Sequence, residues 1–149
     1  MRTRLLALAV LAAALVVVGV AAADDGGRPF TTALTGAAEV PGPGDPDATG
    51  AATVRLNQGL SEVCFDVSWA DVDGEVFAAH IHVGSATVAG PVVVTLFTGS
   101  FSGTDSVSGC ATGVDPELIK AIRHDPEGYY VNVHSRPNFP GGAVRGQLG

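Results

Sequence analysis

The chain has 149 residues, of which 46% are hydrophobic, and it carries 15 acidic against 8 basic residues, for a formal net charge of −7. This length fits one domain with a single hydrophobic core. The acidic balance argues against nucleic acid as a partner, because no basic patch is available to neutralise phosphates.

The N-terminus has the pattern of a secretory signal peptide. Two arginines precede an apolar run from Leu5 to Val18, and small residues ending at Ala23 follow before an acidic pair. We expect cleavage after Ala23, which gives a signal peptide over 1–23, a flexible leader over 24–29 and one domain over 30–149. A retained membrane anchor is the alternative, because a spanning helix needs about 20 apolar residues. After cleavage we expect no membrane association and a secreted, extracellular or envelope location.

Apolar and β-branched runs separated by turn residues predict strands along the mature chain. These runs are 30–36, 48–57, 60–70, 76–84, 91–97, 129–135 and 143–148, with at most one further short strand around Cys110. The proline- and glycine-rich segment 39–47 cannot continue a hydrogen-bonded ladder and is expected to be a loop. The pattern predicts an all-β fold, an antiparallel Greek-key β-sandwich.

One helix is predicted, in the segment "DPELIKAIRHDP". Asp115 is placed as its N-cap and Pro116 at its first position, and Pro126 ends it. Leu118, Ile119 and Ile122 share one face of this helix. His124 falls in the last turn at the surface, so we exclude it from any site.

The two cysteines, Cys64 and Cys110, would enter an oxidising compartment if the chain is exported. We therefore expect one disulfide between them, with a pair of free buried thiols as the alternative. Their spacing is not CxxC, which gives no support to a redox or zinc-ribbon role.

The alternation of side chains along a strand predicts which histidines share a face of the sheet. Residues at i and i+2 share a face, so His80 and His82 point the same way in "HIHVG". If the predicted strands around them are neighbours, one sheet carries a polar stripe formed by His80, His82, Asn132, His134, Arg145 and Gln147.

Three imidazoles of this stripe are a sufficient ligand set for zinc or copper with one position left open for water. Glu39 and Asp66 are the candidates for a carboxylate that accepts a hydrogen bond from a metal-ligating histidine. The alternative is a framework of buried, hydrogen-bonded histidines that contains no metal. Serines lack a G-x-S-x-G or comparable setting, so no hydrolase is predicted.

Three segments in order, "TTALTGAAEVPGPGDPDATGAATVRLN", "AAHIHVGSATVAGPVVVTLF" and "GYYVNVHSRPNFPGGAVRGQLG", resemble the CHRD (chordin-like) domain family over 30–149. The resemblance implies an extracellular all-β domain and no established reaction. A weaker similarity concerns the copper,zinc superoxide dismutases, which also place H-x-H on one sandwich strand and a further histidine in V-x-H on a nearby one. The predicted sandwich is therefore either of the immunoglobulin type or of the superoxide dismutase type. The sequence has no bridging histidine and no zinc loop between Gly84 and Gly113, so a dinuclear dismutase is not expected.

From these observations we predict a secreted CHRD domain protein that is not an enzyme and holds no cofactor. Its predicted role is extracellular binding or structure, with an unidentified extracellular protein or surface component as partner. The alternative is a mononuclear copper or zinc protein that uses His80, His82 and His134.

Overall fold

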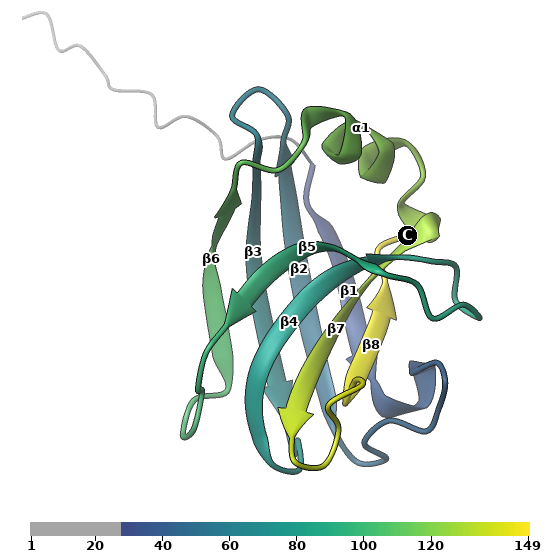
Figure 1. Cartoon of the computed structure of the whole chain (residues 1–149), viewed down its shortest axis with the longest axis vertical. Helices are drawn as coiled ribbons and strands as arrows, with labels where there is room; N and C mark the ends of the chain where they lie inside the picture. Colours follow the sequence, from purple (N-terminus) through teal and green to yellow (C-terminus); the bar gives the residue numbers. More distant parts are fainter. Residues whose placement is uncertain (1–27) are drawn as a thin grey trace, which may run out of the picture.

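A computed structural model describes residues 28–149 (Figure 1), so the predicted signal peptide, its cleavage site and most of the leader lie outside the described residues. Every predicted strand is present, with bounds that differ from the prediction by at most two residues. The strands are β1 (Phe30–Thr35), β2 (Thr49–Asn57), β3 (Glu62–Ala70), β4 (Glu75–Val83), β5 (Val92–Thr98), β6 (Ser106–Thr112), β7 (Tyr129–Arg136) and β8 (Val144–Gln147). The helical elements are α1 (Pro116–His124) and two short 3-10 turns, η1 (Gly36–Ala38) and η2 (Pro126–Gly128).

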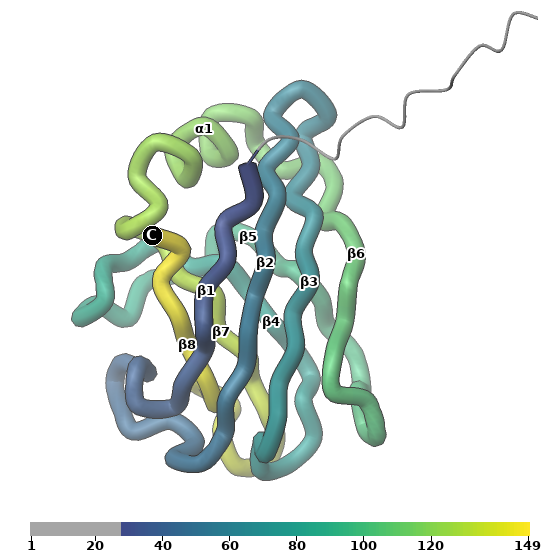
Figure 2. Tube along the Cα trace, turned by 180° about the vertical axis from the view of Figure 1, so that it is seen from behind, coloured from purple at the N-terminus to yellow at the C-terminus, as the bar shows by residue number. Residues whose placement is uncertain are grey.

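The strands form one eight-stranded antiparallel sheet with the order β5-β4-β7-β8-β1-β2-β3-β6. The sheet folds over into two layers, with β4, β5 and β7 on one side and β2, β3 and β6 on the other, as Figure 1 and the reverse view in Figure 2 both show. The two end strands, β5 and β6, contact each other across the gap. Two crossovers, which pair β6 with β3 and β7 with β4, make the topology a Greek key. The predicted fold class is confirmed.

Apolar side chains fill the space between the layers. Along β3 the alternating residues Val63, Phe65, Val67 and Trp69 are buried, as the pattern predicts. Trp69 packs against the ring of Phe97 on the facing layer, with ring centroids 5.8 Å apart. The core therefore lies on one face of each strand and leaves the opposite face of β4, β7 and β8 for other groups.

Helix α1 covers one end of the two layers (Figure 1). Asp115 caps it, because its side chain accepts a hydrogen bond of 2.9 Å from the backbone N–H of Glu117. Ile119 and Ile122 are fully buried, and Leu118 is half-buried on the same face. Within residues 28–149, no helix is long and apolar enough to cross a membrane.

Strand β6 carries one half of the predicted disulfide. Cys110 lies opposite Cys64 in the register of β6 with β3, and the two sulfurs are bonded. The bond joins residues 46 positions apart in the chain, and no free cysteine remains in the described part.

Candidate functional site

The register of three neighbouring strands brings the polar stripe together. On β4, His80 lies opposite Asn132 of β7, which itself lies opposite Arg145 of β8. The next row is His82, Tyr130 and Gln147, and His134 lies opposite Ala78. The stripe occupies the face turned away from the core, since the alternating residues between its members, such as Ile81 and Val133, are core residues.

The three stripe histidines form one compact cluster. One nitrogen from each of His80, His82 and His134 can be chosen so that all three lie within 4.8 Å of one another. Nδ1 of His80 is 3.0 Å from Nε2 of His134. Two nitrogens that each lie about 2.05 Å from a tetrahedral zinc ion are about 3.3 Å apart, so this spacing is close to that of two ligands. The arrangement fits a metal ion with small side-chain movements.

Backbone carbonyls orient two of these imidazoles. Nδ1 of His82 donates to the carbonyl of Gly90 at 2.8 Å, and Nδ1 of His134 donates to the carbonyl of Pro140 at 3.1 Å. A carbonyl only accepts, so Nδ1 carries the proton in both rings, and the neutral ring has its lone pair on Nε2. Nε2 of His82 is buried and has no hydrogen-bond partner among residues 28–149.

His82 is also fixed by packing. Its ring stacks on Tyr130 with centroids 4.8 Å apart and an interplanar angle of 11°. The Tyr130 hydroxyl accepts a hydrogen bond of 3.2 Å from the N–H of Gly90, the same residue that orients His82. The Arg145 guanidinium lies over the Tyr130 ring, 3.3 Å from its centroid.

Arg145 and Gln147 hold the loop between β4 and β5, residues 84–91. Arg145 is 1% exposed and donates to the carbonyls of Ser85 at 2.7 Å and Val88 at 3.1 Å. Gln147 donates to the carbonyl of Gly84 at 3.0 Å and accepts from Arg145 at 3.0 Å. Both stripe residues therefore act on the loop that carries Gly90, and neither forms a hydrogen bond with a histidine among residues 28–149.

The two predicted carboxylates have different positions. Asp66 is exposed on β3, and three strands, β8, β1 and β2, lie between β3 and β7 in the sheet. The prediction that Asp66 supports a metal-ligating histidine was therefore wrong. Glu39 is buried close to Asn132 and Arg145. Burial raises the pKa of Glu39 to about 7, and the charge of Arg145 and the amide of Asn132 act in the opposite direction. The buried atoms Glu39 Oε1 and Asn132 Oδ1 have no hydrogen-bond partner in the described chain.

Two histidines of the cluster, His80 and His134, favour the neutral imidazole. Burial lowers the pKa of His80 to about 4, with a smaller contribution in the same direction from His134 and then His82. Burial also lowers the pKa of His134, against the hydrogen bond to Pro140. Metal ligation requires neutral imidazole, and the lowered pKa values of His80 and His134 favour that form.

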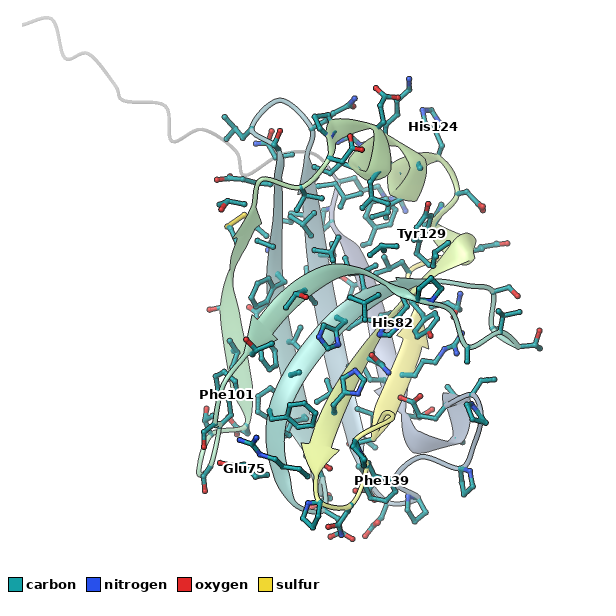
Figure 3. All side chains as sticks on the ribbon, viewed as in Figure 1. Glu75, His82, Phe101, His124, Tyr129 and Phe139 are labelled. Atoms are coloured by element: carbon teal, nitrogen blue, oxygen red, sulfur yellow. A yellow bond between two sulfur atoms is a disulfide. The ribbon has the colours of Figure 1, made fainter. Side chains whose placement is uncertain are left out.

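Some parts of the site could not be read from the sequence. The carbonyls of Gly90 and Pro140 belong to loops, and a backbone carbonyl has no signature in a single sequence. Tyr130 shares the alternation of the stripe, and this was the only signal that could place it there. The exclusion of His124 agrees with the structure: Figure 3 shows it at the helix, well apart from His82, and it is exposed.

Comparisons with known proteins identify the family. No curated protein and no solved structure matches the chain. The family model of the CHRD domain matches residues 30–148, which covers the whole sheet, the helix and all the histidines of the cluster. The chain therefore belongs to the CHRD domain family.

Proposed function

We propose that this CHRD domain binds one copper or zinc ion through His80, His82 and His134 and works outside the cytoplasm as a binding protein, with no catalytic role. The observation that carries the proposal is the buried Nε2 of His82, which bears a lone pair, has no partner in the described chain and belongs to one of the three clustered histidines. The Cys64–Cys110 disulfide, the CHRD family and the predicted signal peptide support a location outside the cytoplasm.

A metal-free framework accounts for the site less well. Buried polar atoms in proteins are nearly always hydrogen-bonded, and leaving one unsatisfied costs about 1–3 kcal/mol. A framework role predicts a partner for every ring nitrogen, yet Nε2 of His82 has none among residues 28–149. A bound metal ion would use this lone pair.

The surroundings of the ligands suit a transition metal. Histidine ligands in metal sites usually donate their second ring nitrogen to a carbonyl or carboxylate, which fixes the tautomer and the ring. Gly90 and Pro140 do this for His82 and His134. Three nitrogens leave a fourth position for water or another ligand, and for a given nitrogen site copper(II) binds more tightly than zinc.

The test is a titration of purified mature protein that has been treated with a chelator. We expect Zn²⁺ and Cu²⁺ each to bind with a stoichiometry of one, and a hundredfold excess over Kd to stabilise the fold by about 2.7 kcal/mol. His82→Ala should abolish this stabilisation, while His124→Ala, which removes an exposed histidine, should retain it.

Two outcomes would contradict the proposal. One is a wild-type protein whose stability is unchanged by either ion. The other is a His82→Ala variant that loses about 1–3 kcal/mol equally with and without chelator, which is the result expected of a framework histidine.

A further inference from the structure

The histidines of the cluster are not held equally. His82 and His134 are 8% and 7% exposed, and each donates from Nδ1 to a backbone carbonyl. His80 is half-buried, and no backbone group in the described chain holds it. Its Nδ1 forms a hydrogen bond with Nε2 of His134, another member of the cluster. A metal ion would have to replace that bond, because it would take the lone pair of Nε2 on His134.

The cluster is enclosed on three sides. Toward β7, the residues opposite His80 and His82 are Asn132 and Tyr130, which are 2% and 3% exposed. Next to His82 lies the loop over 84–91, whose Gly90 carbonyl accepts a hydrogen bond from the ring. Next to His134 lies the turn over 137–143, whose Pro140 carbonyl accepts a hydrogen bond from that ring. From the β7 side an incoming ligand would have to displace buried side chains, and from the two loops it would have to displace the backbone carbonyls that orient His82 and His134.

The fourth side, toward β5, is open. Thr95 lies opposite His80 in the register of β4 with β5, and Val92 lies opposite His82. Thr95 is exposed, and Val92 is 46% exposed. Residues opposite each other on paired strands share a face, so the exposed Thr95 and Val92 border His80 and His82 on the β5 side.

We propose that metal enters and leaves over β5, with His80 as the ligand that is released first, and that the domain is therefore a reversible carrier that passes its ion to an acceptor. The inference rests on the proposed metal site and adds the direction and the order of exchange. His82 and His134 hold the ion while an acceptor with nitrogen or sulfur donors occupies the open position. The metal–nitrogen bond to His80 then breaks, its lone pair returns to the imidazole, and no electron is transferred.

The first experiment measures transfer of Zn²⁺ from the loaded protein to a chromogenic chelator in excess. We expect a transfer rate that rises with chelator concentration, because the acceptor binds before the ion leaves. A rate that is independent of chelator concentration would mean that the ion must first dissociate from a closed site, and would overturn the inference.

A second experiment keeps all three ligands and changes only the approach. Thr95→Trp places a bulky ring beside His80, and we expect it to lower the dependence of the transfer rate on chelator concentration severalfold while leaving Kd for Zn²⁺ unchanged. Thr112→Trp, at an exposed position on β6, is the matched control and should behave as wild type. Equal transfer rates for the two variants would refute entry over β5.

The ligand variants test the order of release. His80→Ala should still bind one Zn²⁺, with a dissociation rate raised at least about tenfold, since affinity differences within one site appear mainly in dissociation. His82→Ala and His134→Ala should bind no Zn²⁺. Equal loss in all three variants would leave the metal site standing and refute the special role of His80, whereas a wild-type protein that binds no metal would refute both proposals.

Discussion

Replacement of Glu39 by glutamine should stabilise the protein at alkaline pH. Glu39 is 7% exposed, and its buried Oε1 has no hydrogen-bond partner in the described chain. Its pKa rises from 4.5 to about 7 in the native state because burial disfavours the charged carboxylate. Glutamine has the shape of the protonated side chain and never ionises, so it removes this penalty.

The direction and the size of this stability difference follow from the proton that Glu39 binds in the native and the unfolded states. Between pH 4.5 and about 7, native Glu39 keeps its proton while the unfolded chain loses it, so the stability of the wild type falls as pH rises through this window. The difference between the two pKa values corresponds to about 3 kcal/mol, which is fully present above pH 7. The loss of the Glu39 charge should not leave the guanidinium of Arg145 without partners, because Arg145 still donates to the carbonyls of Ser85 and Val88 in the variant.

The assay is urea unfolding at a series of pH values, followed by the fluorescence of Trp69, the only tryptophan, which is 8% exposed. With chelator present, we expect wild type and Glu39→Gln to be about equally stable at pH 4 and the variant to gain up to about 3 kcal/mol at pH 8. Glu127→Gln, at an exposed position, should show no such pH-dependent gain. A gap between wild type and Glu39→Gln that does not change with pH would show that ionisation of Glu39 is not the cause.

Two further predictions concern the disulfide and the helix. Replacing both Cys64 and Cys110 by serine should lower the free energy of unfolding by about 4 kcal/mol, because opening a loop of 46 residues restores chain entropy to the unfolded state; urea midpoints of the variant and wild type that coincide would contradict this. Asp115→Ala should lower the free energy of unfolding by about 1 kcal/mol in the same assay, because the N–H of Glu117 loses its cap. Asp115→Asn should retain most of the stability, and equal losses in both variants would argue against a capping role.

Local periodicity was sufficient to predict the strands, the helix and the shared face of His80 and His82. Each of these depends on residues close in the chain: the alternation in β3 and β4, the cap and proline around α1, and the two-residue period of a strand. The pairing of Cys64 with Cys110 could also be predicted, because the chain has two cysteines and the expected compartment is oxidising.

The strand order was decided only by the tertiary structure, because the pairing of β7 with β4 joins segments about 50 residues apart that carry no local record of each other. That pairing brings His134 to His80. The strand order as a whole leaves Asp66 in solvent on β3, and the fold buries Glu39 beside Arg145. The orientation of the imidazoles depends on the carbonyls of Gly90 and Pro140, and the backbone presents the same carbonyl whatever the side chain. Sequence by itself determined which residues could form the site, and the long-range packing of strands and loops determined which of them meet and which nitrogen lone pairs they leave free.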